Sequence, residues 1–405
     1  MKSMRFGLII AILLAAAVFA GCMSRPAPEG FSGIVSDGDT LYVGSSDGRI
    51  VALDTAQRAT NAAYPAPGEW EYGITTESGG TFGCSTSQVA STVYGTPVLA
   101  DDHLCVGTYE GQVFMLDAGA RTANSAFPQV RSGEWKYPRE DEELGPIVGS
   151  PAIVGDTVFV CSSVSEKRRT YGIVYAIDKL YGDELWVSDR LDGKLWVTPA
   201  VVNGIVYIST YDGHIYALSA DTGELQSWSY EAEVGFVSSP LVQNGIVYVG
   251  SFDRTLQAVP LGASAAQWSF EGGNWFWAMP VMIGDVLYAP SLDGSLYALS
   301  AGSGSEVWAE PFVASGPLAT TPVVMGDKLG LVTKDGDVYV VDVSTGRGTR
   351  IENPDNEKAT TCDASVVAPP AYHQGMMFVR TQKNVLWAID PVARKVDYTF
   401  ALDME

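Results

Sequence analysis

The sequence is poor in the residues that build most metal and catalytic centres. Its 405 residues include three histidines, five cysteines and no CxxC motif, which leaves little material for a zinc site. The three histidines, His103, His214 and His373, give no pattern typical of a Ser-His-Asp triad. We therefore expect no metal site and no hydrolytic centre.

Positive charge is also scarce. The 25 Lys and Arg residues face 47 Asp and Glu residues, and the net charge of −22 becomes −24 once the segment with Lys2 and Arg5 is removed. A surface of this charge cannot compensate phosphate, so nucleic acid is not an expected partner. The longest basic cluster is Lys167-Arg168-Arg169, which we interpret either as a solvated loop tip or as a docking point for an acidic partner.

The longest apolar run is too short to span a bilayer comfortably. Fifteen uncharged residues, Phe6 to Ala20, follow two cations, a pattern typical of a secretion signal. Phe19-Ala20-Gly21-Cys22 resembles the lipobox of bacterial lipoproteins, in which the cysteine carries the lipid; an ordinary secretion signal is the alternative. We expect a signal peptide at 1–21, a lipidated Cys22 with a tether at 22–30, a folded domain at 31–405, and an extracytoplasmic protein anchored to a bacterial membrane.

The other four cysteines fall into two kinds. Cys105 and Cys161 lie in apolar, strand-like runs and are expected to be small buried residues. Cys84 and Cys362 lie in polar connections and could form a disulfide in an oxidising compartment. Spacing alone does not establish that pairing.

One unit recurs eight times along the chain. VYISTYDGHIYALS (206–219) recurs, for example, as VYVGSFDRTLQAVP (247–260) and LYAPSLDGSLYALS (287–300), with an uninterrupted period of 40 to 42 residues. This period is typical of a four-stranded propeller blade, and alternating apolar residues around an Asp-Gly turn predict a hairpin. We therefore predict an all-β fold, an eight-bladed β-propeller of four-stranded antiparallel blades.

Proline and tryptophan recur in step with the unit. The prolines mark the start of each innermost strand and are Pro97, Pro151, Pro199, Pro240, Pro280, Pro322 and Pro370, with Ile34 in that place in the first unit. The tryptophans lie near each fourth strand, where we expect them to wedge between blades, and are Trp70, Trp135, Trp186, Trp228, Trp268 and Trp308. Two similar insertions, 58–72 and 121–137, would deliver the first two of these rings.

Two of the units carry a recognisable family motif. ALSAGSGSEVW (298–308) and AIDKLYGDELW (176–186) resemble the AxDxxTGxxxW docking motif of pyrroloquinoline-quinone-type propeller repeats, and the resemblance extends over about 31–400. One branch of that family comprises quinoprotein dehydrogenases. The other comprises non-catalytic eight-bladed lipoproteins, including the propeller subunit of the outer-membrane β-barrel assembly machinery, and this branch implies a role in envelope-protein assembly.

The residues favour the non-catalytic branch. Quinoprotein dehydrogenases hold their cofactor against a disulfide between adjacent cysteines, and this sequence has no adjacent pair. Many carboxylates are instead expected to cap Asp-Gly turns, as at Asp47, Asp212, Asp293 and Asp335. We expect no cofactor and no catalysis. The alternative is a quinoprotein-type oxidoreductase, or a protein that binds a saccharide or another small molecule in its channel.

Aromatic residues precede several of the entry prolines. They should gather around one channel opening, because repeats place equivalent positions on one ring, and they are Tyr94, Trp196, Phe236, Trp275, Phe276 and Trp277. This collar either binds a partner or closes the channel by packing on itself. The sequence thus favours a membrane-anchored scaffold that binds an envelope or exported protein. We further expect closure of the ring to join the N-terminal strands to YTFALDM (398–404).

Overall fold

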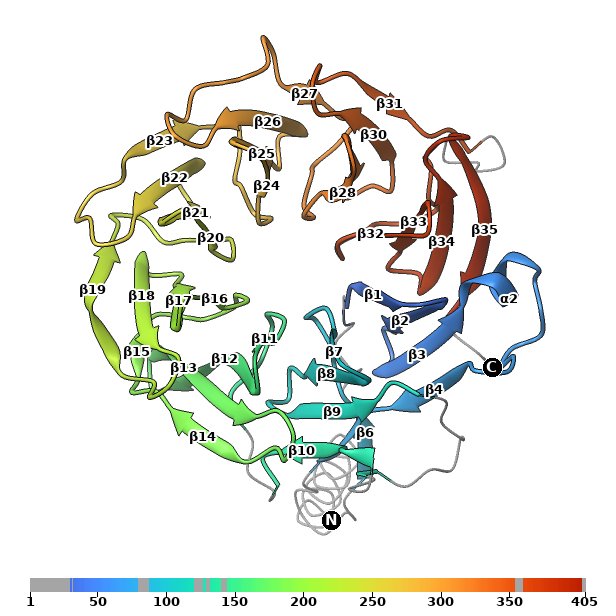
Figure 1. Cartoon of the computed structure of the whole chain (residues 1–405), viewed down its shortest axis with the longest axis horizontal. Helices are drawn as coiled ribbons and strands as arrows, with labels where there is room; N and C mark the ends of the chain where they lie inside the picture. The colour runs from blue at the N-terminus through green and yellow to red at the C-terminus, as the bar shows by residue number, and fades with distance from the viewer. Residues whose placement is uncertain are drawn as a thin grey trace, which may run out of the picture.

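Eight sheets surround a common axis in the computed structural model of the chain (Figure 1). The structure describes residues 30, 32–78, 87–119, 127–128, 132–139, 144–353 and 360–402, with only the backbone at 76–78 and 87–89. Each sheet contains four antiparallel strands that follow one another in sequence, and β15 adds a short fifth strand to the third. The predicted eight-bladed, all-β propeller is confirmed.

The strands of each blade run in order from the axis outward. Blades 1 to 4 comprise β1 (Ile34–Asp37), β2 (Thr40–Gly44), β3 (Arg49–Asp54) and β4 (Trp70–Gly73); β7 (Val98–Ala100), β8 (His103–Gly107), β9 (Val113–Asp117) and β10 (Trp135–Tyr137); β11 (Ala152–Val154), β12 (Thr157–Glu166), β13 (Arg169–Asp178), β14 (Glu184–Val187) and β15 (Leu191–Asp192); and β16 (Ala200–Val202), β17 (Ile205–Ser209), β18 (His214–Ser219) and β19 (Leu225–Glu231).

Blades 5 to 8 repeat the same order. They comprise β20 (Leu241–Gln243), β21 (Ile246–Gly250), β22 (Thr255–Pro260) and β23 (Trp268–Glu271); β24 (Val281–Ile283), β25 (Val286–Pro290), β26 (Ser295–Ser300) and β27 (Phe312–Val313); β28 (Val323–Met325), β29 (Lys328–Val332), β30 (Val338–Asp342) and β31 (Gly348–Arg350); and β32 (Ala371–His373), β33 (Met376–Arg380), β34 (Val385–Asp390) and β35 (Lys395–Ala401). Outside the blades lie a five-residue helix, α2 (Thr55–Ala59), and the paired strands β5 (Thr75–Ser78) and β6 (Ser87–Ala90).

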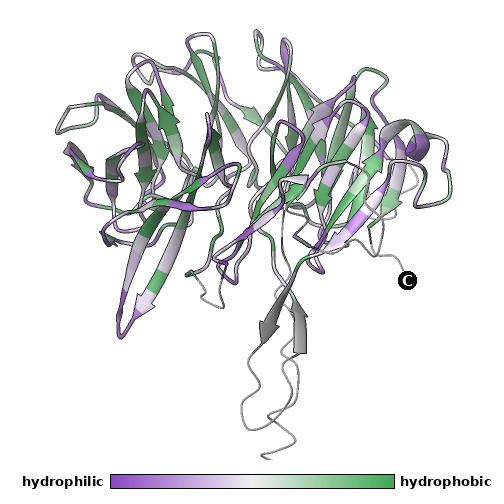
Figure 2. Cartoon of the chain, turned by 60° about the horizontal axis from the view of Figure 1, so that its bottom comes forward, coloured by the Kyte–Doolittle hydropathy of each residue, from purple (hydrophilic) through white to green (hydrophobic). Residues whose placement is uncertain are grey.

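The position of a strand in its blade explains its composition. The two middle strands are covered by neighbouring blades on both faces, so β2 and β21 are buried along four of their five residues and consist largely of apolar residues. The outermost strand faces solvent on one side, and along β35 exposed residues alternate with partly buried ones. In Figure 2 hydrophobic residues are concentrated in the strands and hydrophilic residues at many of the turns.

Eight apolar cores, one between each pair of neighbouring blades, hold the ring together. The core between blades 3 and 4 contains Phe159, Trp186 and Leu218. The core between blades 8 and 1 contains Leu53, Phe378 and, from the last described turn of the chain, Leu402. Stability therefore depends on interfaces between blades as much as on each blade.

Ring closure differs from the expectation. The segment YTFALDM does not pair with the N-terminal strands, because residues 398–401 belong to β35, which pairs with β34 inside blade 8. Every strand of blade 1 comes from the N-terminal part of the chain. The ring closes instead by packing of blade 8 on blade 1, supported by a hydrogen bond from Arg49 Nη2 to Leu402 O at 3.1 Å.

The two ends of the ring carry different loops. One end, which we call the mouth face, consists of the hairpins between second and third strands, such as 210–213, and the connections between blades, such as 232–240. The opposite end, the turn face, consists of the two other turns of each blade, such as 203–204 and 220–224. The tight turn at Asn203-Gly204 has φ of 52° and 75°, typical of a type I′ hairpin. No helix among the described residues is long and apolar enough to cross a membrane.

Candidate partner-binding site at the channel mouth

The structure places the six tryptophans at equivalent positions in the interfaces between blades. Each indole Nε1 donates to a carbonyl that follows the third strand of the next blade, at 2.8 to 3.3 Å. The acceptors, in chain order, are Ala118, Lys179, Ala220, Ala263, Ala301 and Val343. Trp228 is partly buried and the other five rings are buried. These rings position the blades, and with them the loops of the mouth face.

Both insertions deliver their tryptophan to this position. Trp70 and Trp135 are 3% and 4% exposed and bond to the following blade like the others. In the first insertion a buried ion pair fixes the loop: Arg58 Nε lies 2.8 Å from Glu69 Oε1. In the second, Glu134 is buried and accepts from the backbone N–H of Asp117 at 3.1 Å. The insertions thus carry their own buried polar support.

Connections from seven blades converge on one cavity at the mouth face, with a volume of about 440 Å³. Its lining contains aromatic, hydroxyl and small apolar side chains: Tyr94, Gly95, Thr96, Val148, Gly149, Ser150, Trp196, Thr198, Tyr211, Val237, Ser239, Trp277, Ala278, Met279, Ala319, Thr320, Thr321, Val367 and Pro369. None of these residues carries a carboxylate, an imidazole or an amine, so they are suited to recognition by packing and hydrogen bonding.

Hydroxyl groups link the connections of neighbouring blades. Thr96 N donates to Ser150 Oγ, Ser150 N donates to Thr198 Oγ1, and Thr198 N donates to Ser239 Oγ, each at 2.9 Å. Each hydroxyl therefore satisfies the backbone donor of the residue that precedes an entry proline. This chain of bonds holds the cavity wall of blades 2 to 5 in one conformation.

Two neighbouring connections approach each other so closely beside the cavity that position 149 requires glycine. A Cβ on Gly149 would lie 2.1 Å from Val197 O, which is backbone and cannot move aside. We expect Gly149→Ala to lower the free energy of unfolding by about 1–3 kcal/mol through overpacking, measured by urea denaturation. Gly302→Ala is the control, because nothing lies within 4 Å of its Cβ; equal losses in the two variants would contradict the close approach.

Four rings form a continuous row across blades 4 to 6 on the mouth face. Trp196, Tyr211, Phe252 and Trp275 contact one another in sequence, edge to face, with centroids 5.3 to 6.0 Å apart. Lys194 extends this aromatic row, with its Nζ 2.8 Å from the centroid of Trp196, and burial lowers the pKa of this lysine. Such a row offers flat apolar faces with one cation at its end.

Four of the six residues expected at the mouth lie at the cavity or in the aromatic row. Tyr94, Trp196 and Trp277 line the cavity, and Trp277 is 41% exposed. Trp275 belongs to the aromatic row.

The predicted position at the mouth is wrong for two residues. Phe236 and Phe276 are fully buried and pack in the cores between blades. Consecutive side chains of an extended segment point to opposite sides. When Trp277 faces the cavity, Phe276 therefore turns inward, where it contacts Tyr297 at 5.7 Å between ring centroids.

Two ring positions of the row were not anticipated. Tyr211 and Phe252 occupy the hairpins of blades 4 and 5, in TYDG and SFDR. The signal was an aromatic directly before the turn aspartate, at the same place in the repeat. Burial raises the pKa of Tyr211, so its phenol stays protonated at neutral pH.

Two of the turn carboxylates, Asp293 and Asp47, form hydrogen bonds that stabilise the loops of the mouth face. Asp293 accepts hydrogen bonds from Gly273 N at 2.9 Å and Ser295 N at 2.7 Å. Burial alone would raise the pKa of Asp47, but hydrogen bonds from Arg49 and Ser45 outweigh it and lower that pKa. Asp47 is thus occupied within its own hairpin, whereas Asp293 also links its turn to the connection at Gly273.

The cysteines are placed in part. Cys105, Cys161 and Cys362 are buried, and burial raises the pKa of all three thiols. Cys84 lies outside the described residues, so its pairing with Cys362 stays a prediction. Cys22 and the signal segment also lie outside them. No group of three or more metal-binding side chains occurs among the described residues.

Comparison with known proteins agrees with this architecture. Residues 170–275 and 265–349 match a family model described as outer membrane protein assembly factor BamB. The match spans residues 170–349, less than half of the chain, and supports pyrroloquinoline-quinone-type (PQQ-like) propeller repeats there. BamB from Moraxella catarrhalis superposes with a TM-score of 0.60 at 17% identity, covering 87% of this chain and 91% of that chain. A computationally designed protein, Ika8, superposes with a TM-score of 0.59 at 12% identity, covering 93% and 98%. A search of curated proteins finds no match.

At these identities the two superpositions show the fold alone. The range matched by the family model includes the docking residues Trp186, Trp228, Trp268 and Trp308. The comparisons do not specify what the channel mouth of this chain recognises.

Proposed function

We propose that this propeller is a non-catalytic scaffold, tethered to a bacterial membrane through Cys22, that binds an envelope or exported protein at its channel mouth. The description of the matching family model, an outer membrane assembly factor, supports a role of this class. The apolar run at 6–20 and the lipobox-like residues before Cys22 support localisation outside the cytoplasm.

The composition of the channel mouth is the observation that carries the proposal. A cavity of about 440 Å³ lies within the range of about 300–1,000 Å³ typical of binding sites. Its partly exposed rings and hydroxyls lie on connections between blades, and hydrogen bonds between neighbouring connections hold them in place. Exposed aromatic rings on a rigid support are typical anchors for a protein partner. We propose that the partner presents an extended apolar segment to the cavity and the aromatic row.

The alternative, quinone-dependent oxidation, finds less support in the residues. A quinone site would need calcium ligands, and the described lining of the channel supplies no carboxylate. A saccharide could pack against the same rings.

The test is recovery of a partner from solubilised envelope membranes. The full-length protein should copurify with one protein in stoichiometric amount. The double variant Trp196→Ala/Trp277→Ala should reduce that amount about tenfold or more, because each anchoring ring contributes about 1–3 kcal/mol. Tyr181→Ala is the matched control, since this ring is 63% exposed and lies in a loop of the turn face.

Three outcomes would contradict the proposal. Unchanged recovery with the double variant would remove the mouth as the binding site. Turnover of an alcohol by the purified protein with quinone and calcium would establish catalysis instead. Saturable binding of a glycan that depends on the two tryptophans, with no protein partner, would favour the saccharide alternative.

A further inference from the structure

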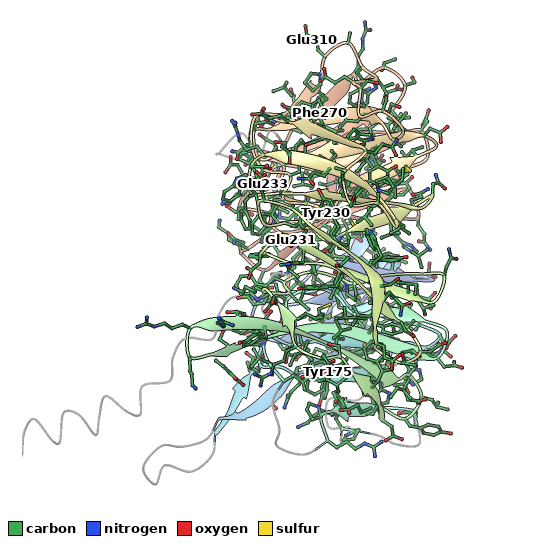
Figure 3. The ribbon with its side chains drawn as sticks, turned by 90° about the vertical axis from the view of Figure 1, so that its left-hand side faces the viewer. Tyr175, Tyr230, Glu231, Glu233, Phe270 and Glu310 are labelled. Carbon is green, nitrogen blue, oxygen red and sulfur yellow. The ribbon has the colours of Figure 1, made fainter. Side chains whose placement is uncertain are left out.

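The β12–β13 hairpin carries a concentrated positive charge beyond the rest of the mouth face. Its strands have ten residues each, whereas the corresponding β17 has five and β18 six. At about 3.3 Å per residue, the additional four or five residues extend the hairpin by about 15 Å. Figure 3 shows this hairpin projecting beyond one side of the disc. Lys167, Arg168 and Arg169 form its exposed tip.

The carboxylate beside the tip is already neutralised. Glu166 accepts two hydrogen bonds from Arg190, at 2.6 and 2.9 Å, and the guanidinium also stacks over Tyr171 at 5.3 Å. Hydrogen bonds and charge from Arg190 hold the pKa of Glu166 below its ordinary value. None of the three tip cations forms an ion pair with another described residue, so their charge is available to an external anion.

The described chain enters the propeller on this same face. Gly30 O accepts a hydrogen bond from the buried Arg380 at the end of β33, and a Cβ on Gly30 would meet the backbone of Val93, in the connection to blade 2. Both contacts lie at the mouth face. Gly30 therefore lies on the side where the basic hairpin projects.

We propose that Lys167, Arg168 and Arg169 bind the anionic phosphate headgroups of the membrane that holds the lipid anchor, and turn the mouth face towards it. This inference rests on the proposed attachment at Cys22. Gly30 follows Cys22 by eight positions, so the segment between them spans at most about 29 Å. The hairpin extends about 15 Å, which is less than the greatest length of the tether, so the tether is long enough for the tip to reach the headgroups.

The negative charge of the rest of the protein favours the same orientation. With a net charge near −24, the folded domain is repelled by an anionic surface. Cations at one projecting tip are attracted, provided that they lie within a Debye length, about 8–10 Å. The expected result is contact at the tip, with the channel mouth held off the bilayer and open to a partner.

Trypsin cleavage tests the contact, because the tip itself supplies the cleavage sites. The acylated full-length protein is inserted into vesicles of phosphatidylethanolamine with phosphatidylglycerol, or of phosphatidylcholine alone. Cleavage after residues 167–169 should be about tenfold slower on the anionic vesicles, and the protection should disappear at about 0.5 M salt. Cleavage at Arg347, on the turn face, corrects for any accumulation of trypsin at the anionic surface.

Two charge variants make the test specific. Lys167→Asn/Arg168→Ser keeps the site at Arg169 and should lower the protection to about threefold or less; asparagine suits the left-handed backbone at 167, where φ is 57°. Lys328→Ser/Arg394→Asn removes the same charge from the turn face and should leave protection unchanged.

Equal cleavage on both kinds of vesicle, or equal loss of protection in the two variants, would overturn the headgroup contact. The anchor is tested separately by flotation, since Cys22→Ser protein should not float with vesicles of phosphatidylcholine. If that variant still floats, the anchor at Cys22 and the tether geometry are both wrong. Failure of the partner experiment affects neither result.

Discussion

Glu69→Ala is expected to lower the free energy of unfolding by about 3–5 kcal/mol, although Glu69 lies far from the channel. Its side chain is fully buried and pairs with Arg58, which is 3% exposed, through Nε to Oε1 at 2.8 Å. It also accepts from the backbone N–H groups of Ala66 and Asp54, at 2.8 and 3.0 Å. Alanine would leave a guanidinium buried without its counter-charge, which is costly in a protein interior.

The location of this pair increases its importance. Arg58 also lies over the ring of Phe400, 4.8 Å from its centroid, and Phe400 belongs to blade 8. The ion pair therefore supports the interface where the first and last blades meet. Because no strand is shared across that interface, loss of the pair should promote opening of the ring there.

A matched comparison separates burial from charge. Glu71→Ala removes a carboxylate that pairs with Arg49 at 2.9 Å but is 39% exposed, and should cost less than about 1 kcal/mol. Both variants are compared by urea denaturation at neutral pH. The double variant Arg58→Met/Glu69→Leu should regain part of the loss, because it leaves no unpaired buried charge but still deprives the N–H groups of Ala66 and Asp54 of their acceptor. Equal costs for Glu69→Ala and Glu71→Ala would refute the argument.

The blades were predictable because their signals are local and repeated. Alternation around the Asp-Gly turns specifies a hairpin within some fourteen residues, and the eight copies report the number of blades directly. Trp268 and Trp308 could be assigned to the interfaces for the same reason, since a fixed offset from a strand fixes a position on the ring. Neither inference needs contacts between distant residues.

Features that depend on long-range contacts were not predictable. The repeat placed Phe276 and Trp277 together, but which of them faces the cavity depends on the pleat of a connection without regular hydrogen bonding. Similarly, Arg58 and Glu69 are visible in the first insertion, but their pairing requires the loop to fold against blade 8. The closing contact of Leu402 with blade 1 depends on the last turn of the chain packing across the closed ring.

The docking tryptophans lead to the second large effect. Trp268→Ala should lower the free energy of unfolding by about 3–5 kcal/mol, because the ring is 9% exposed and its removal leaves a cavity in the core between blades 5 and 6. The carbonyl of Ala301, which accepts from Nε1 at 2.9 Å, would also lose this partner. Trp277→Ala removes an equally large but 41% exposed ring and should cost less than about 1 kcal/mol.

A double-mutant cycle with Gly304 distinguishes docking from general packing. Gly304 has φ of 70°, and a Cβ there would lie 2.6 Å from the indole of Trp268. Gly304→Ala should therefore lower the free energy of unfolding for two reasons: about 1–2 kcal/mol for the left-handed backbone, and more for the collision. Gly262→Ala should lower it only through the backbone, because φ at Gly262 is 85° and no atom lies within 4 Å of its Cβ.

In the Trp268→Ala background the collision is absent, so Gly304→Ala should then cost no more than Gly262→Ala. The coupling energy, measured by urea denaturation of the four proteins, should be about 1 kcal/mol or more. Additive losses would mean that the indole does not seat against this glycine. Blade docking would then depend on the hydrogen bond to Ala301 and the apolar core, and the glycine of the motif would serve only its own turn.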